Sequence, residues 1–224
     1  MSNTPHVITV DAAGTLIRPW PSVGAVYAQA AREFGLVVED DAIDRRFYEV
    51  FGKVQKDHKI TSGEEKDFWR QVVFAVFKPH ADKTDLDPLF EELWELFARG
   101  KHWRLADGAK DTLFQLKERG YRLAVLSNND SRLRCVLNDL AIDSLFEKIF
   151  ISSEIGIEKP ETGIFREVEK AFGKEPSCFL HIGDSHSRDF VGAREAGWDA
   201  LLFGKPIIEE RQITSFPELL GLLP

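Results

Sequence analysis

The sequence predicts an α/β fold, in which a parallel sheet carries helices on both faces and a small helical segment is inserted after the first strand. Short β-rich runs alternate with helical patterns from Tyr121 onward, as expected of parallel strands joined by helices. A similar run, Val7-Ile8-Thr9-Val10, stands alone near the N-terminus, and no strand pattern occurs between Val23 and Arg99. The length of 224 residues corresponds to about one and a half domains.

Four further runs in the second half of the chain predict the remaining core strands. They cover residues 122–126, 148–152, 178–182 and 200–203. Helical patterns accompany them over residues 107–119, 131–140, 162–172 and 187–196, and Gly120, Gly173 and Gly197 act as stop signals. We assign the first strand to the same sheet.

The inserted segment is predicted to form four consecutive helices. Apolar residues at helical spacing begin at Val23 and Ile43, and Ser62-Gly63-Glu64-Glu65 fits a capping box that opens the third helix. Asp87 and Pro88 predict the N-cap and first position of the fourth helix, and Gly100 its end. The predicted division is a core of residues 1–17 and 104–224 and a helical domain of residues 18–103.

Composition and charge exclude several classes of protein. The contents of 43% hydrophobic and 29% charged residues are typical of a globular protein rather than a collagen-like, coiled-coil or disordered one. A net charge of −8 without a block of Lys and Arg argues against nucleic acid or a membrane surface as a partner. No run approaches the ~20 apolar residues of a membrane span, and no signal-peptide pattern is present. We expect a cytoplasmic protein with reduced, buried cysteines at positions 135 and 178.

Polar side chains follow the predicted core strands. Asp11 follows the first strand, Ser127-Asn128-Asn129-Asp130 the second, the loop to Lys159 the third, and Gly183-Asp184-Ser185-His186-Ser187-Arg188-Asp189 the fourth. Because ligands bind beyond the carboxyl ends of parallel strands, we expect these residues to converge.

The chemistry of this set points to phosphoryl transfer. Three carboxylates brought together, those of Asp11, Asp184 and Asp189, favour Mg²⁺, which can also hold a phosphate oxygen. Lys159 and Ser127 can donate to phosphoryl oxygens, and Asp11 can be a nucleophile that forms an aspartyl-phosphate.

These motifs resemble those of the haloacid dehalogenase-like hydrolases, in the order found in that family. Asp11-Ala12-Ala13-Gly14-Thr15 is similar to the first motif, Leu126-Ser127-Asn128 to the second, Lys159-Pro160 to the third, and Gly183-Asp184 with Asp189 to the fourth. The helical insertion is similar to the first type of cap in this family. Residues 61–74, with Phe68-Trp69, are similar to a branch named after rhythmically expressed genes.

The resemblance implies a Rossmann-like core and a role for each motif residue. It makes Asp11 the nucleophile and assigns Ser127, Asn128 and Lys159 to the phosphate of a small phosphorylated substrate. It also implies Mg²⁺ held by Asp11, Asp184 and the backbone carbonyl of Ala13, with Asp189 reaching the ion through water.

Ala13 departs from the pattern of the phosphatases in this family, which carry a second aspartate there as general acid and base. Alanine keeps the backbone carbonyl but removes a proton shuttle of the kind that typically contributes about 10²–10⁴-fold. We therefore expect slow turnover of alkyl phosphates and better turnover of acyl phosphates or anhydrides.

Three other functions stay open at this stage. The 2-haloacid dehalogenases share Asp-Ala-x-Gly-Thr-Leu, need no metal and use a cap arginine, for which Arg45 or Arg46 are candidates, but they lack the later Gly-Asp. Phosphonoacetaldehyde hydrolases use a cap lysine, for which Lys53 or Lys56 are candidates, but they carry arginine in place of Lys159. The third alternative is a module that binds a phosphorylated ligand without efficient turnover.

Several other polar and aromatic residues have structural interpretations. We expect Asp130 to cap the following helix, His181 to be buried and hydrogen-bonded, and His186 to lie in an exposed loop. The tryptophans of the insertion are expected to pack within the cap and hinge: Trp69, Trp94 and Trp103.

Overall fold

The computed structural model describes residues 6–57, 63–81 and 84–224, which contain a six-stranded sheet. The strand order is β5-β4-β1-β6-β7-β8, and every neighbouring pair is parallel. This confirms the predicted α/β class with a Rossmann-like core. The strands are β1 (Val7–Val10), β4 (Arg122–Ser127), β5 (Lys148–Ile151), β6 (Phe179–Gly183), β7 (Asp199–Phe203) and β8 (Gln212–Ile213).

The order of the strands determines where a ligand site can form. β1 pairs with β4 on one side and with β6 on the other. The chain extends the sheet from β4 to β5 and then crosses back to β6, so the direction of winding reverses at β1. Such a reversal leaves a crevice beyond the carboxyl ends of the strands, where ligands bind in open parallel sheets.

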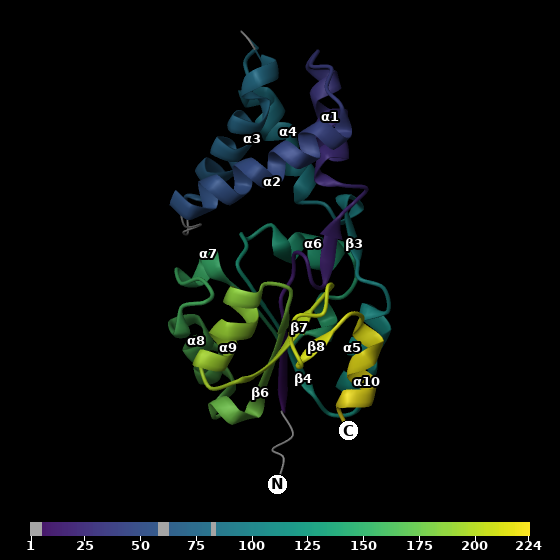
Figure 1. The fold of residues 1–224 in the computed structure, drawn as a ribbon, viewed down its shortest axis with the longest axis vertical. Coiled ribbons are helices and arrows are strands. Elements are labelled where there is room, and N and C mark those ends of the chain that lie inside the picture. The colour runs from purple at the N-terminus through teal and green to yellow at the C-terminus, as the bar shows by residue number, and fades with distance from the viewer. Residues whose placement is uncertain (1–5, 58–62, 82–83) are drawn as a thin grey trace.

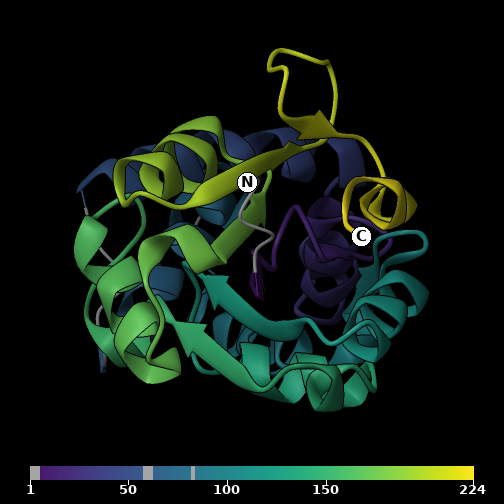
Figure 2. The same ribbon diagram turned by 90° about the horizontal axis from the view of Figure 1, so that it is seen from below.

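Helices cover both faces of the sheet, and the side chains of β1 show why (Figure 2). Ile8 and Val10 pack into one apolar cluster, whereas Val7 packs into another. Because successive side chains of a strand point to opposite faces, a strand covered on both faces is apolar along most of its length. The first cluster includes residues of α5 (Ala109–Glu118), α6 (Leu133–Asp139) and α10 (Leu219–Leu222), and the second those of α8 (Thr162–Phe172) and α9 (Gly192–Glu195).

Within its described residues, the inserted segment forms four helices around a buried cluster of its own, and we call α1–α4 the helical unit (Figure 1). Tyr27 lies at the centre of this cluster, with its ring centroid 5.5 Å from that of Phe47 and 5.9 Å from that of Phe77. The longest of these helices has 18 residues and several charges. The four helices are α1 (Val23–Glu33), α2 (Asp40–Asp57), α3 (Glu65–Ala81) and α4 (Asp87–Phe97).

Two short strands that the sequence did not predict lie at the junction of the helical unit and the core. β2 (Ile17–Pro19) pairs in antiparallel fashion with β3 (Trp103–Leu105). At three residues each, they are too short for an alternating pattern to be recognised. Their pairing holds the outgoing and returning chain segments together at the junction (Figure 1).

Some predicted boundaries differ from the structure. Leu86, not Asp87, is the N-cap of α4, and the carboxylate of Asp85 accepts a hydrogen bond from the Asp87 amide at 3.0 Å. Gly100 does not end α4 but begins a short 3₁₀ helix after it. The predicted capping box begins at Ser62, which lies outside the described residues.

The prediction that both cysteines are buried is wrong for Cys135, which is exposed, and Cys178 is only half-buried. On α6 the buried face is formed by Leu133, Val136 and Leu137, which leaves position 135 on the outer side. Both thiols are free.

No helix within the described ranges is both long and apolar enough to cross a membrane.

Replacing Phe165 by alanine tests how α8 packs against the sheet. The Phe165 ring is fully buried, with its centroid 5.1 Å from that of Trp198 and 6.1 Å from that of His181. Its removal leaves a cavity, so we expect the free energy of unfolding to fall by about 3–5 kcal/mol in urea denaturation. Phe114→Ala, at a side chain of α5 that is 53% exposed, is the matched control and should cost less than about 0.5 kcal/mol. Equal losses in the two variants would contradict this packing.

Candidate active site

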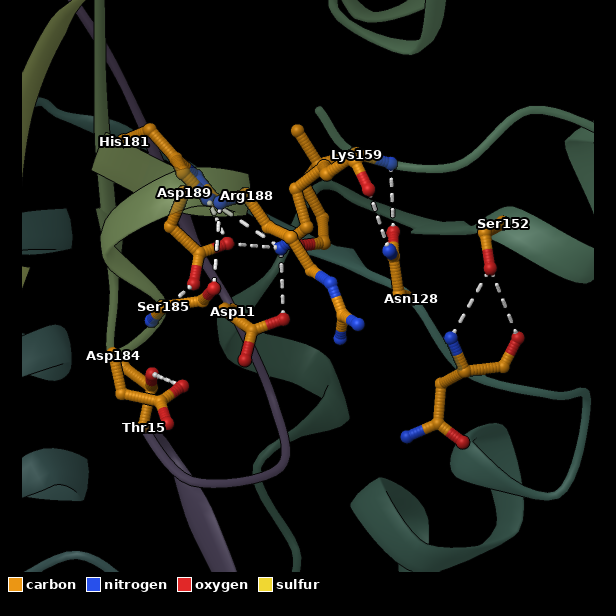
Figure 3. Close-up of polar contacts among 12 residues, drawn as sticks. Asp11, Thr15, Asn128, Ser152, Lys159, His181, Asp184, Ser185, Arg188 and Asp189 are labelled. Carbon is orange, nitrogen blue, oxygen red and sulfur yellow. Dashed lines mark hydrogen bonds and ion pairs between the residues drawn. The ribbon is translucent and has the colours of Figure 1, made fainter. Parts of the chain in front are cut away.

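Asp11 and Lys159 form a buried ion pair at the carboxyl edge of the sheet (Figure 3). Lys159 Nζ lies 2.8 Å from Asp11 Oδ1. Asp11 directly follows β1, and its amide donates to the Ile182 carbonyl at 2.8 Å, which continues the pairing of β1 with β6. Lys159 lies in the loop between α7 (Ser152–Ile155) and α8. Both side chains therefore come from the ends of elements packed around the central strand.

The ammonium group of Lys159 has three acceptors. Besides Asp11, they are Asp189 Oδ1 at 2.6 Å and the Leu126 carbonyl oxygen at 2.7 Å. An ammonium group has three N–H donors, so each of its protons can be used. The backbone of Lys159 is held as well, since Asn128 Nδ2 donates to its carbonyl at 2.9 Å and its amide donates to Asn128 Oδ1 at 2.8 Å. Asn128 thus positions the lysine.

Asp189 is held by three groups. Its Oδ1 accepts from Lys159 and lies 3.1 Å from His181 Nε2, and its Oδ2 accepts from the Ser185 amide at 2.9 Å. His181 is buried as predicted, and its Nδ1 lies 2.8 Å from the Thr9 hydroxyl. A neutral ring that carries its proton on Nε2 satisfies both contacts, with the Thr9 hydroxyl donating to Nδ1.

The backbone before Asp189 departs from the predicted helix of residues 187–196. His186–Val191 forms a wider π-helical turn, which Ser185 caps by accepting from the Arg188 amide at 3.3 Å, and α9 follows it. This turn directs the Asp189 carboxyl back against β6, where a Cβ atom at Gly183 would collide with it. Such wide turns often lie at functional sites.

Asp184 is fixed by the segment that follows Asp11. Thr15 Oγ1 donates to Asp184 Oδ1 at 3.1 Å. Gly14 has φ +98°, and a Cβ atom there would lie 2.5 Å from Asp184 Oδ2. Only glycine combines this backbone conformation with so close an approach.

The three predicted metal-binding carboxylates converge, since one oxygen from each of Asp11, Asp184 and Asp189 lies within 4.8 Å of the others. Asp189 already accepts hydrogen bonds at both oxygens, so it suits an outer position linked through water. Asp11 and Asp184 each keep an oxygen for direct contact. Ala13, two residues after Asp11, also lines the cavity. A set of hard oxygen donors fits Mg²⁺.

Burial and charge move the pKa values within this cluster in opposite directions. Burial raises the pKa of Asp11 to about 6, although the Lys159 cation opposes the shift. Burial also raises the pKa of Asp184, and the carboxylate of Asp189 adds to it. For Asp189 itself burial acts upward, but the Lys159 cation and the hydrogen bond from His181 outweigh it and hold its pKa well below the usual range.

Two cationic or potentially cationic groups of the cluster also have shifted pKa values. Burial lowers the pKa of Lys159, but the carboxylates of Asp11 and Asp189 outweigh it, so the pKa lies above its ordinary value. Burial, followed by the Lys159 cation, lowers the pKa of His181. Lysine is therefore charged and histidine neutral near pH 7.

The other predicted residues lie in three different settings. Ser127 ends β4, is buried and lines the cavity. His186 is exposed, as predicted, and its Nε2 lies 2.8 Å from Glu209 Oε1. The prediction that Asp130 caps the following helix is wrong, because the N-cap of α6 is Arg132 and has no side-chain cap hydrogen bond. The carboxylate of Asp130 accepts from the Arg132 amide at 3.1 Å, is buried, and is bound to a side chain of the helical unit.

Those candidate residues of the alternative functions whose side chains the structure describes do not line the cavity. Arg46 donates to the carbonyl oxygens of Ala75 and Val76, at 2.8 and 2.7 Å. Arg45 and Lys53 are exposed. None of these cap cations lines the cavity within the described residues. The side chain of the remaining candidate, residue 56, lies outside the described part.

A cavity of about 420 Å³ lies between the carboxyl edge of the sheet and the helical unit. Its polar end includes Asp11, Ser127, Lys159 and Asp184, and its other end is formed by side chains of α1–α4. Pockets for small molecules usually measure about 300–1,000 Å³. The volume therefore suits a small substrate.

Sequence reasoning missed the contacts that join the helical unit to the site. Arg188 Nη2 donates to Gln55 Oε1 at 2.7 Å, and Trp69 Nε1 donates to Asp130 Oδ2 at 2.8 Å. Arg188 lies within the fourth motif, and Asp130 lies two residues after the end of the second motif. Their partners are 133 and 61 residues away along the chain, so local patterns carried no signal for them.

Lys159→Met tests whether the buried ammonium stabilises the fold. Removing it leaves the carboxylates of Asp11 and Asp189 buried without a counter-charge. In Mg²⁺-free buffer near pH 7 we expect the free energy of unfolding to fall by about 3–5 kcal/mol. In the folded variant, the buried carboxyls of Asp11 and Asp189 bind protons more readily than the same carboxyls in the unfolded chain. Acidification therefore stabilises the folded variant, and its loss in free energy of unfolding relative to the wild type should shrink as pH falls toward about 5.

The control for this change is Lys66→Met. Lys66 forms an exposed ion pair with Glu91 at 2.6 Å, and its loss should cost less than about 1 kcal/mol. A similar cost in the two variants, or a deficit for Lys159→Met that grows on acidification, would contradict the structural role of the buried cation.

Solved structures of known proteins share this fold. The HAD-hydrolase YfnB from Bacillus subtilis, whose structure was determined bound to magnesium, has a TM-score of 0.74 and 22% identity, over 98% of this chain and 99% of that chain. A dehalogenase structure has a TM-score of 0.75 and 21% identity, over 100% of this chain and 99% of that chain. At these identities the similarity shows the fold alone.

Sequence comparison gives the family. The chain is 32% identical over 210 residues to haloacid dehalogenase-like hydrolase domain-containing protein 3 of Homo sapiens, over 90% of this chain and 82% of that protein. The family model for haloacid dehalogenase-like hydrolases matches residues 5–197. The chain therefore belongs to the haloacid dehalogenase-like hydrolases and is an enzyme of the hydrolase class.

Proposed function

We propose that this chain is a Mg²⁺-dependent phosphohydrolase that acts on a small phosphorylated molecule through an aspartyl-phosphate on Asp11. The observation that carries the proposal is the convergence of three carboxylates at the edge of the sheet, two of which, those of Asp11 and Asp189, contact the buried ammonium of Lys159. The three carboxylates and the one ammonium group together carry an excess of negative charge, which a divalent cation balances. A metal ion next to a carboxylate nucleophile suits an anionic phosphoryl group.

In this proposal Asp11, Asp184 and the Ala13 carbonyl hold the metal directly, and Asp189 holds it through water. The assignment follows from the hydrogen bonds, since both oxygens of Asp189 already have protein donors. When bound, Mg²⁺ supplies positive charge to the phosphoryl oxygens and helps to orient them. The fixed positions of Gly14 and Thr15 around Asp184 keep its carboxylate aimed at the same point.

The first step transfers the phosphoryl group to the enzyme. A carboxylate oxygen of Asp11 attacks phosphorus, the bond from phosphorus to the leaving oxygen breaks, and the electron pair goes to that oxygen. Lys159 holds Asp11 in one orientation and adds positive charge beside the phosphoryl oxygens, and the Ser127 hydroxyl donates to them. Asn128 acts by fixing the backbone of Lys159.

The second step returns the enzyme to its starting state. Water attacks phosphorus, the bond from phosphorus to the Asp11 oxygen breaks, and inorganic phosphate leaves while a proton of the water passes to solvent. Ala13 lines the cavity beside the nucleophile but offers no group to move a proton in either step. Substrates whose leaving oxygen is stable as an anion are therefore favoured.

We further propose that residues 18–103 act as a cap over a core of residues 1–17 and 104–224. Support comes from the position of the cavity between the helical unit and the sheet, and from the hydrogen bonds of Arg188 with Gln55 and of Trp69 with Asp130 across it. A cap in this position excludes water from the reacting groups and contacts the leaving group of the substrate.

Halide displacement is the second candidate, and Ala13 is the observation that favours it. It would use Asp11 as nucleophile at a carbon atom and would release halide without a proton. Against it, an oxygen of Asp184 lies within 4.8 Å of oxygens of Asp11 and Asp189, which suits a metal ion that halide displacement does not need, and Arg45 and Arg46 do not line the cavity. We therefore place it second.

Acetyl phosphate is the first substrate to test, because acetate leaves without protonation. We expect Mg²⁺-dependent release of phosphate by the wild type, and a rate lowered at least about 10³-fold by Asp11→Asn, which removes the nucleophile. EDTA should abolish turnover. Asp199→Asn, at an acidic residue outside the cavity, is the control and should leave the rate unchanged.

Two results would contradict phosphoryl transfer at Asp11. One is equal phosphate release by the wild type and Asp11→Asn. The other is release of chloride from 2-chloropropionate in the presence of EDTA, which would establish halide displacement instead.

Ala13→Asp tests whether a missing proton shuttle limits the enzyme. The new carboxyl can protonate an alkoxide leaving group, so we expect kcat for glycerol 2-phosphate to rise by about 10²–10⁴-fold. Acetyl phosphate, which needs no protonation, should change by less than about tenfold. Ala13→Asn has a similar size without the acid and should give no increase. No gain with Ala13→Asp would instead favour a module that binds a phosphorylated ligand without efficient turnover.

A further inference from the structure

The end of the cavity opposite the carboxylates is almost entirely apolar. Among the described cavity-lining residues of α1–α4, Gln55 alone has a side chain that is neither aromatic nor aliphatic, and its amide oxygen accepts from Arg188. Five members of this wall are Phe47, Phe51, Trp69, Phe90 and Trp94. Apart from the hydroxyl groups of Tyr27 and Tyr48, such a wall offers few hydrogen-bond partners to a substrate rich in hydroxyl groups.

The aromatic rings of this wall are ordered in a row. Phe47 and Phe51 stack with centroids 5.6 Å apart and an interplanar angle of 15°, and Phe51 and Trp69 stack at 5.7 Å and 20°. Trp69 is fixed at the end of the row by its hydrogen bond to the buried carboxylate of Asp130. The rings are thus held in place before a ligand binds, which limits the entropy lost on binding.

Two of the three arginines that line the cavity are committed to protein groups, and the third, Arg18, lies in β2 rather than in the helical unit. Arg132 binds Asp130 through Nε at 2.8 Å and Nη2 at 2.7 Å, donates to the Trp94 carbonyl, and lies 3.6 Å from the Trp94 ring centroid. Arg188 donates to Gln55. Arg132 and Arg188 therefore do not offer a second anion site among the aromatic side chains of the wall.

We propose that the substrate is a phosphorylated molecule whose leaving group carries an aromatic ring. Its phosphoryl end lies at Asp11 and Lys159, and the ring lies against Phe51 and Trp69. This inference rests on the proposed function, and it adds the chemical class of the leaving group. Phosphoryl transfer follows the two steps given above: the aromatic acid or phenol leaves with the electron pair of the broken bond and is released as its anion.

Two acyl phosphates isolate the contribution of the ring. Benzoyl phosphate and acetyl phosphate have leaving groups of similar acidity and differ by a phenyl ring against a methyl group. We expect kcat/KM to be about 10- to 100-fold higher for benzoyl phosphate, because the ring is removed from water against the wall. Phe51→Ala should lower this ratio by about tenfold. Phe114→Ala, at an exposed ring of α5 outside the cavity, should leave the ratio unchanged.

A binding measurement keeps the inference testable without turnover. In the presence of Mg²⁺, phenylphosphonate should bind at least about tenfold more tightly than methylphosphonate in titration calorimetry, and Phe51→Ala should reduce the difference. Asp11-dependent turnover with equal kcat/KM for the two acyl phosphates would overturn this inference and leave the proposed function intact. Absence of turnover with both would overturn the proposed function, and equal binding of the two phosphonates would overturn the ring site.

Discussion

The site depends on a single buried cation, the ammonium group of Lys159. A charge removed from water must be compensated where it lies, and here the compensation comes from the Asp11 carboxylate, the Asp189 carboxylate and the Leu126 carbonyl. These acceptors lie at the ends of β1 and β4 and in the turn after β6. The cation therefore fixes the relative positions of segments far apart in sequence. Removing one of its partners leaves a buried charge that is not fully compensated.

Several details of the backbone follow from this constraint. The wide turn of residues 186–191 brings Asp189 back under the lysine, and Gly183 supplies the space that its carboxyl occupies. Asn128 then holds the lysine backbone on the opposite side. With Lys159 shared between two carboxylates, Asp184 and the free oxygen of Asp11 remain as ligands for a divalent cation. The same geometry thus orients the nucleophile and leaves a metal position next to it.

The sheet could be predicted because its strands are visible as local apolar patterns. The convergence of the polar residues could be predicted because parallel sheets bind ligands beyond the carboxyl ends of their strands. Buried strands such as residues 122–127 are recognisable as apolar runs, and parallel strands bring the residues after their carboxyl ends together. The π-helical turn, the short strands β2 and β3, and the contact of Trp69 with Asp130 were not predictable in this way. Each depends on tertiary partners that no local spacing identifies.

The loss of a carboxyl at Ala13 and the apolar wall of the cavity are consistent with each other. A cavity whose far end is lined by aromatic side chains provides few groups to protonate a leaving oxygen, and alanine at position 13 adds none, so that oxygen must leave with its negative charge. An oxygen bonded to an aryl or acyl carbon can do so through delocalisation, whereas an alkoxide cannot. The wall binds the uncharged part of such a group, and the charged oxygen stays at the end of the cavity where Lys159 and the metal position lie. Recognition and chemistry are thus separated along the cavity, and both favour an acidic leaving group attached to a ring.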